Sequence, residues 1–215
     1  PLSAFTDPRI EEMYLAFGAQ TAKTTFMLVC LCYVLDQDPG PALWVMPNEL
    51  LARSFSQTRL QPLIDESPEL AKEKPQDRDQ FKLLEMHFRR MTLNLVGSNS
   101  PANLSSRPIR YLFADEVDKF PLATTREGSA LNLGKRRTAS FWNRKLLISS
   151  TPTTADGQIW SGLLSGDWRE FYVPCPHCNA AQVLKFVNIR IPEKLRDPDE
   201  IRDVAWYECE KCGKK

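Results

Sequence analysis

A lysine followed by two threonines, placed after a run of small residues, is the first feature that could do chemistry. The eight residues are Gly18, Ala19, Gln20, Thr21, Ala22, Lys23, Thr24 and Thr25. A loop of small residues lets backbone N–H groups converge on phosphate oxygens, while a lysine and a neighbouring hydroxyl hold the phosphates and a magnesium ion. The segment predicts a nucleotide site made by all eight residues, with Thr24 as a magnesium ligand.

Two adjacent carboxylates at the end of an apolar run form the second motif. Tyr111 to Ala114 is apolar and leads directly into Asp115 and Glu116. Carboxyl ends of parallel strands meet at one edge of a sheet, so these carboxylates are expected beside the phosphate loop. Asp115 would then hold Mg²⁺, and Glu116 would polarise an attacking water. A chance Lys-Thr pair or an ordinary strand end explains either motif alone, but together they predict an ATPase that uses ATP and Mg²⁺, with Lys23 and Glu116 as catalytic residues.

The loop departs from the usual pattern G-x-x-x-x-G-K-[ST]. Counting back from Lys23, Phe17 stands at the first glycine position, with Gly18 one place late, and Ala22 stands at the second. Alanine adds only a methyl group, so the loop is expected to close if Ala22 avoids a left-handed conformation.

Hydroxyls and arginines elsewhere could complete the site. Ser150 and Thr151 follow another apolar run and are predicted to couple the loss of the γ-phosphate to movement, although an ordinary strand-ending turn explains them equally well. Arg136 and Arg137 are candidates to neutralise transition-state charge, from within the chain or from a neighbouring subunit. Arg137 is taken as the catalytic one, and a solvated basic turn is the alternative.

Four of the six cysteines form two Cys-x-x-Cys pairs: Cys175, Cys178, Cys209 and Cys212. Four thiolates at such spacing can close a tetrahedral zinc site with no open position, which predicts a structural Zn²⁺. Disulfides are the alternative, and they are disfavoured in a chain of cytosolic character. Cys30 and Cys32 lie in an apolar helix and are expected to be core residues.

The apolar pattern predicts strands at 12–17, 43–46, 111–114 and 145–149, with a helix at 23–35 after the loop. Asn48 is expected to cap a further helix, 67–79 reads as a loop, and 88–96 as a strand or hairpin. Strands this apolar suit a buried parallel sheet. The pattern changes after Trp168, which predicts an ATPase domain over 1–168 and a separate cysteine module over 169–215.

Composition restricts the function. With 28 Lys and Arg against 27 Asp and Glu, the formal net charge of +1 gives no global basic signature, so any DNA contact must be local. Arg89 and Arg90 are possible contacts, although a solvated face is favoured. No apolar run reaches the roughly 20 residues that a membrane span requires. We expect a protein without a membrane partner, and an excerpt of a longer chain.

The motifs resemble the ATPase region of the large terminase subunit of tailed bacteriophages, in the lambda-type GpA family. The resemblance rests on 18–24 (GAQTAKT), 45–47 (VMP), 97–102 (GSNSPA), 114–121 (ADEVDKFP), 135–141 (KRRTASF), 148–153 (ISSTPT) and 173–178 (VPCPHC). It implies a P-loop NTPase of the ASCE type, a three-layer α/β/α fold with a mostly parallel sheet, followed by a small zinc-ribbon-like β module.

The same resemblance implies a motor that translocates double-stranded DNA into a procapsid in the host cell cytoplasm. Its partners would be a small terminase subunit and the procapsid portal, and its large subunits would assemble as homo-oligomers on DNA. An adenine-contacting segment would precede Pro1, and a nuclease domain would follow Lys215. Two alternatives remain from the residues: a helicase-like ATPase that acts on nucleic acid, and a catalytically silent scaffold that binds DNA or protein.

Overall fold

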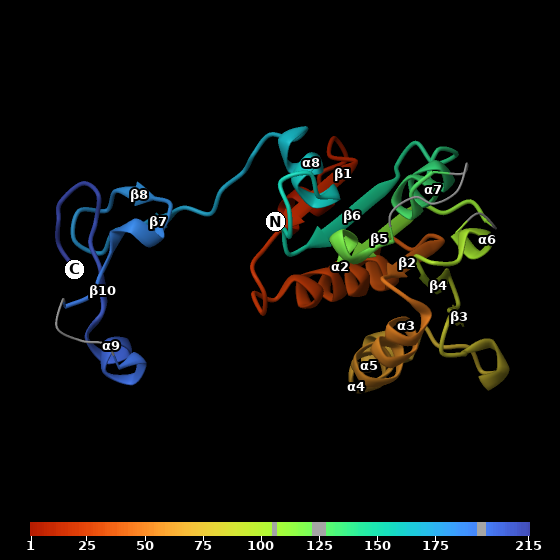
Figure 1. The fold of residues 1–215 in the computed structure, drawn as a ribbon. Coiled ribbons are helices and arrows are strands. Elements are labelled where there is room, and N and C mark those ends of the chain that lie inside the picture. Colours follow the sequence, from red (N-terminus) through yellow and green to blue (C-terminus); the bar gives the residue numbers. More distant parts are fainter. Residues whose placement is uncertain (105–106, 122–127, 193–196) are drawn as a thin grey trace. The chain divides into compact units, whose positions relative to one another are not determined.

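Six strands form one sheet in the first part of the chain (Figure 1). The computed structural model describes residues 1–104, 107–121, 128–192 and 197–215. The strands, in the order in which they lie across the sheet, are β1 (Glu12–Ala16), β6 (Lys145–Ser150), β5 (Tyr111–Asp115), β2 (Ala42–Met46), β4 (Thr92–Gly97) and β3 (Glu85–His87). Every neighbouring pair is parallel except β3 and β4, which form an antiparallel hairpin. The predicted mostly parallel α/β sheet is therefore confirmed.

Helices cover both faces of this sheet, in three layers (Figure 1). One face carries α2 (Lys23–Gln37), α3 (Glu49–Phe55), the π-helical η1 (Ser56–Leu60), α4 (Gln61–Glu66) and α5 (Pro68–Ala71). The other carries α6 (Pro101–Leu104), η3 (Val117–Lys119), α7 (Ala130–Arg137) and α8 (Gln158–Leu164). The short α1 (Leu2–Thr6) and η2 (Arg78–Gln80) complete this unit.

The central strands are apolar because both of their faces are buried. All five residues of β2 are buried, with Trp44 facing the α2 layer and Val45 facing the α7 layer. Trp44 stacks on Phe113 of the next strand, with ring centroids 5.1 Å apart. Such double burial is typical of parallel sheets, and it explains why these strands show continuous apolar runs in the sequence.

Most predicted elements are present, and one is corrected. The side chain of Asn48 accepts a hydrogen bond from the N–H of Leu51, as expected for a helix cap. The stretch 67–79 is not all loop, because Pro68–Ala71 forms α5 and buries Leu70 against α2. Pro68 stands in the first turn of that helix, where its missing N–H costs nothing.

The chain divides into two compact units, Pro1–Gly166 and Asp167–Lys215. The second contains two small antiparallel ladders: β7 (Val173–Pro174) with β8 (Ala181–Gln182), and β9 (Ile189–Arg190) with β10 (Trp206–Tyr207). It also contains η4 (Phe186–Asn188) and α9 (Pro198–Val204). Within the described residues, no helix is both long and apolar enough to cross a membrane.

Candidate functional site

The phosphate-loop lysine contacts the end of a strand far away in the sequence. Lys23 is 6% exposed, and its Nζ donates to the backbone oxygen of Gly18 at 3.1 Å and to Oγ1 of Thr151 at 2.8 Å. Nζ also lies 3.8 Å from Oε1 of Glu116. The first side chain of α2 therefore joins three of the predicted site segments.

Asp115, at the end of β5, is held by two hydroxyl groups. Oγ1 of Thr24 donates to Oδ2 at 2.8 Å, and Oγ of Ser149 donates to Oδ1 at 2.6 Å. Asp115 is 1% exposed, so this pair of donors fixes a buried carboxylate. Thr24 and Asp115 thus stand together, and their oxygen atoms are ligands of the kind that Mg²⁺ prefers.

Glu116 lies next to two ammonium groups at the point where the strand turns. Its Oε1 is 3.8 Å from Nζ of Lys23, and its Oε2 is 3.3 Å from Nζ of Lys119. Its backbone is left-handed, with φ 60° and ψ 47°. A non-glycine residue in this region is strained, and such strain is concentrated at functional sites.

The loop itself closes in a way that the sequence did not predict. Ala22 adopts a left-handed conformation, with φ 65° and ψ 23°, and Gln20 has φ 56°. The sequence set a condition, that the loop closes if Ala22 avoids this region, and Ala22 does not meet that condition. The left-handed backbone costs an L-residue about 1–2 kcal/mol, so the loop closes at the expense of strain that glycine would not have.

The two predicted coupling residues occupy different positions. Thr151 contacts Lys23 directly, whereas Oγ of Ser150 is buried and accepts from the backbone N–H of Asp118 at 3.2 Å. Asp118 was not predicted as a site residue, although it belongs to the same acidic run. Its carboxylate accepts from the N–H groups of Thr153 and Ile159 at 3.2 and 2.9 Å, so it ties the segment after β6 to η3.

Arg137 and Arg90, which the sequence offered as a catalytic residue and a DNA contact, do not lie beside Lys23 in this chain. The backbone oxygen of Arg137 accepts from the N–H of Ile109, which precedes β5. At about 3.3 Å per residue, roughly 20 Å of chain separates Ile109 from Asp115 at the far end of that strand, so the structure does not bring Arg137 to Lys23. Arg90 donates to the carbonyls of Leu35 and Asp36 and pairs with Glu73, which makes it a cap on the end of α2.

The four paired cysteines converge in the second unit. One sulfur from each of Cys175, Cys178, Cys209 and Cys212 lies within 4.8 Å of all the others. The Sγ atoms of Cys175 and Cys212 are 3.9 Å apart, and those of Cys178 and Cys209 are 3.8 Å apart. Zinc–sulfur bonds of about 2.3 Å place tetrahedral sulfurs about 3.8 Å apart, so the cluster fits that ion. The cysteines are free thiols, and no disulfide links them.

The two cysteine turns have the same backbone geometry. The N–H of Cys175 donates to the oxygen of Ala180, and the N–H of Cys209 donates to that of Lys214. A left-handed residue follows each turn, Asn179 in the first and Gly213 in the second. The amides of Cys212 and Lys211 lower the pKa of Cys209 to about 6, which favours the thiolate that binds metal.

Cys30 belongs to the core. It is completely buried in α2, and burial raises the pKa of its thiol to about 12. The thiolate is therefore disfavoured, as expected for a cysteine that serves as a small apolar residue.

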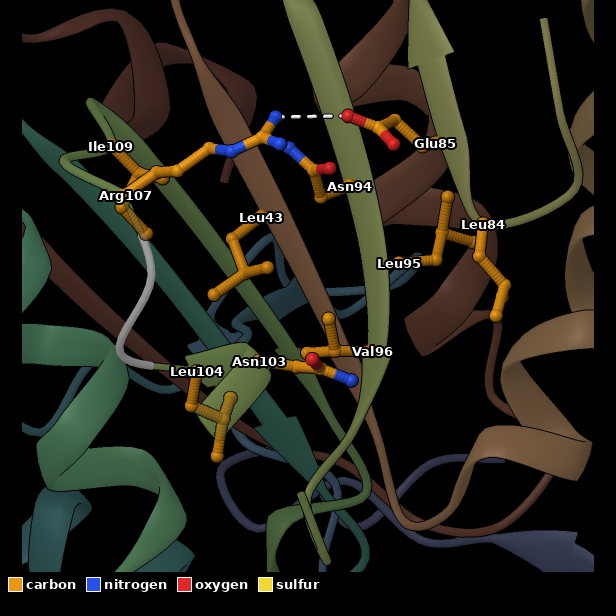
Figure 2. Close-up of a pocket in the computed structure, with 10 residues that line it drawn as sticks. All are labelled: Leu43, Leu84, Glu85, Asn94, Leu95, Val96, Asn103, Leu104, Arg107 and Ile109. Carbon is orange, nitrogen blue, oxygen red and sulfur yellow. Dashed lines mark hydrogen bonds and ion pairs between the residues drawn. The ribbon is translucent and has the colours of Figure 1, made fainter. Parts of the chain in front are cut away.

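A pocket near β4 is lined by residues other than those of the predicted nucleotide site (Figure 2). Its lining residues are Leu43, Leu84, Glu85, Asn94, Leu95, Val96, Asn103, Leu104, Arg107 and Ile109. Figure 2 shows the ion pair between Nη1 of Arg107 and Oε1 of Glu85, 2.9 Å long, beside mostly apolar walls. None of the lining residues belongs to the phosphate loop or to the Asp115–Glu116 pair, so this pocket is not the predicted nucleotide site.

The sequence is similar to the large subunits of two phage terminases. The chain is 25% identical over 210 residues to the terminase large subunit of Enterobacteria phage P21, a match that covers 95% of this chain and 33% of that protein. It is also 25% identical over 216 residues to the terminase large subunit of Escherichia phage lambda, covering 97% of this chain and 34% of the relative. The chain therefore spans about a third of the length of these relatives.

The fold has a counterpart among solved structures. The large terminase ATPase domain of Thermus phage P74-26 superposes with a TM-score of 0.55 at 17% identity, covering 80% of this chain and 71% of that one. The family model described as phage terminase large subunit gpA, ATPase domain, matches residues 1–215. With the phosphate-loop lysine, the acidic pair and the parallel sheet in place, the chain belongs to the ATPase domain family of phage terminase large subunit gpA.

Proposed function

We propose that this chain is the ATP-hydrolysing motor of a phage packaging terminase, which translocates double-stranded DNA into a procapsid. The observation that carries the proposal is the meeting of Lys23, Thr24, Asp115, Glu116 and Thr151 at one edge of the sheet. Membership of a terminase ATPase family supports the same activity.

The contacts of each side chain support a specific role for it. Lys23 would neutralise the phosphates of ATP, and Thr24 with Asp115 would hold Mg²⁺. The bound ion would supply positive charge that offsets the charge developing on the phosphates during transfer. Glu116 would orient the attacking water and accept its proton.

The bond between Lys23 and Thr151 gives the proposal its coupling step. A phosphate oxygen would compete with Oγ1 of Thr151 for the ammonium group of Lys23. Binding and loss of the γ-phosphate would therefore release and restore a contact at the end of β6. Ser150 and Asp118 would pass this change to the segment that leads into α8.

The proposal includes partners and a second module. The large subunits would assemble on DNA at the procapsid portal, aided by a small terminase subunit, in the host cell cytoplasm. Arg137 remains a prediction for a residue that acts on a neighbouring subunit's nucleotide. The cysteine cluster would bind one structural Zn²⁺ in a zinc-ribbon-like module over 169–215, after an ATPase domain over 1–168.

ATP hydrolysis measured with DNA alone, and with DNA plus procapsids, tests the function. A packaging motor predicts that procapsids stimulate hydrolysis and that DNA becomes protected from added nuclease. Full stimulation by DNA alone, accompanied by strand separation, would support the helicase-like alternative. ATP binding without turnover under any condition would support the silent scaffold.

A further inference from the structure

A π-helical turn interrupts the helices that follow β2. In η1, the N–H of Gln61 donates to the oxygen of Ser56, five residues back. Pro62 follows, and a proline ring has no N–H and collides with the carbonyl four residues earlier in an α-helix. A wider turn before Pro62 would relieve that collision. Such turns occur frequently at functional sites, because they redirect the side chains that they carry.

This turn carries an arginine that reaches the phosphate loop. Nη2 of Arg59 donates to Oγ1 of Thr25 at 3.3 Å. The three consecutive side chains at the start of α2 thus contact three different segments: Lys23 contacts the end of β6, Thr24 contacts the end of β5, and Thr25 contacts η1. Figure 1 shows α3 and α4, which flank η1, on the α2 side of the sheet.

Arg59 differs from its neighbour Arg53 in its charge partners. Arg53 forms an ion pair with Glu49 at 2.8 Å on the same helix. Over the part of the chain that the structure describes, Arg59 pairs with no carboxylate, and its contact is the neutral hydroxyl of Thr25. An uncompensated guanidinium therefore stands beside the start of α2, where backbone N–H groups and the helix dipole already favour an anion.

We propose that Arg59 binds the phosphates of the nucleotide from the side of η1, at the end away from the hydrolysed bond. The guanidinium retains further N–H donors that can bind phosphate oxygens in a fork. In the proposed site, Lys23, Glu116 and Thr151 would bind at the γ-phosphate end, whereas Thr25 contacts η1, which is a different segment. Arg59 would therefore bind groups that ATP and ADP share.

This inference rests on the proposed nucleotide site, and it predicts how the affinities for ATP and for ADP change when Arg59 is replaced. Replacing Arg59 by glutamine should weaken the binding of ATP and ADP by the same factor, about tenfold for one charge-assisted phosphate contact. Arg59→Lys should show a smaller loss, because it keeps the charge without the fork. Both side chains in the contact are exposed, so neither variant should change the urea midpoint of unfolding.

Calorimetric titration with ATP and with ADP tests this prediction. The proteins compared are the wild type and the variants Arg59→Gln, Arg53→Gln and Lys23→Ala. The expected result is equal loss for both nucleotides in Arg59→Gln and no loss in Arg53→Gln. Unchanged affinities in Arg59→Gln, or a loss confined to ATP, would overturn the assignment. If Lys23→Ala still lowers affinity, only the role of Arg59 fails, whereas wild-type protein that binds neither nucleotide would overturn the proposed function itself.

Discussion

Nζ of Lys23 donates a hydrogen bond of 2.8 Å to Oγ1 of Thr151, across 128 positions of sequence. The bond joins the first residue of α2, at the end of the phosphate loop, to the residue directly after β6. Since the same ammonium group lies 3.8 Å from Glu116, one cation contacts both the proposed base and the proposed coupling residue. Nucleotide binding and movement at the end of β6 can therefore be linked through a single side chain.

Replacing Thr151 by valine tests that link. Valine keeps the branched shape but accepts no hydrogen bond from Lys23, so the contact that would re-form after loss of the γ-phosphate is missing. The turnover rate should therefore fall by about tenfold, the value of one hydrogen bond to a charged group. KM for ATP should change less than about threefold, because Lys23 itself remains. Thr6→Val is the control, since that hydroxyl donates to carbonyls of its own helix, α1. A larger change in KM than in turnover would contradict the coupling role.

Replacing Ala22 by glycine should stabilise the protein. The left-handed backbone at this position, φ 65°, strains alanine and not glycine, so the free energy of unfolding should rise by about 1 kcal/mol. Ala19→Gly is the matched control in the same loop, because Ala19 is not among the residues with positive φ. Urea titration should show that this control lowers stability by about 0.4–1 kcal/mol. The opposite order of the two variants would show that Ala22 is unstrained.

The end of α2 gives a prediction about acid stability. Burial raises the pKa of Asp38, but hydrogen bonds from Arg110 and Tyr111 together lower the pKa by more than burial raises it. The net pKa of Asp38 therefore lies below its ordinary value of 3.8. A lowered carboxyl pKa contributes stability above pH 3.8, and that contribution is lost as the pH falls through the folded value.

Asp38→Asn should therefore lower the free energy of unfolding by about 1 kcal/mol at pH 7. It should also flatten the pH dependence of stability below pH 4. Asp36→Asn is the control, since the Asp36 carboxylate accepts from neighbouring Gln37 and not from Arg110 or Tyr111. Urea titrations at pH 3 to 7 measure both effects, and parallel pH curves for wild type and Asp38→Asn would exclude the proposed pKa shift.

Removing metal should affect the second unit alone. Four thiolates close the proposed zinc site, so a chelator should release one zinc per chain and make Cys175, Cys178, Cys209 and Cys212 reactive towards a thiol reagent. Affinity for ATP should persist, because the phosphate loop lies in Pro1–Gly166. Cys209→Ser should purify without zinc, and Cys32→Ser should retain it. Zinc in neither wild type nor Cys32→Ser would disprove the metal site.

The sequence predicted the buried strands, the cysteine cluster and the meeting of Thr24 with Asp115, because residue type and spacing are enough to indicate each of them. Apolar runs identified the buried strands, and the cysteine spacing identified the cluster that forms in the second unit. The hydroxyl of Thr24 and the carboxylate of Asp115 were expected together, since parallel strands bring loops to one edge.

What the sequence missed depends on tertiary geometry. The left-handed backbone of Ala22 follows from how the loop closes and not from its composition. Arg59 and Asp118 reach the site from η1 and η3, and no spacing rule relates either residue to Lys23. Arg137, predicted to neutralise charge from within the chain or from a neighbour, ends its helix beside Ile109, at the other end of β5, so only the role in a neighbouring subunit stays a prediction.

Magnesium-dependent ATP hydrolysis by the purified protein, beside Glu116→Gln and Lys23→Ala, tests the central claim most directly. We expect Glu116→Gln to bind ATP with wild-type affinity and to lose at least about a hundredfold in turnover, because a general base contributes roughly 10²–10⁴. Lys23→Ala should lose both binding and turnover. Turnover in Glu116→Gln equal to that of the wild type would contradict the assignment of this site as the centre of ATP hydrolysis.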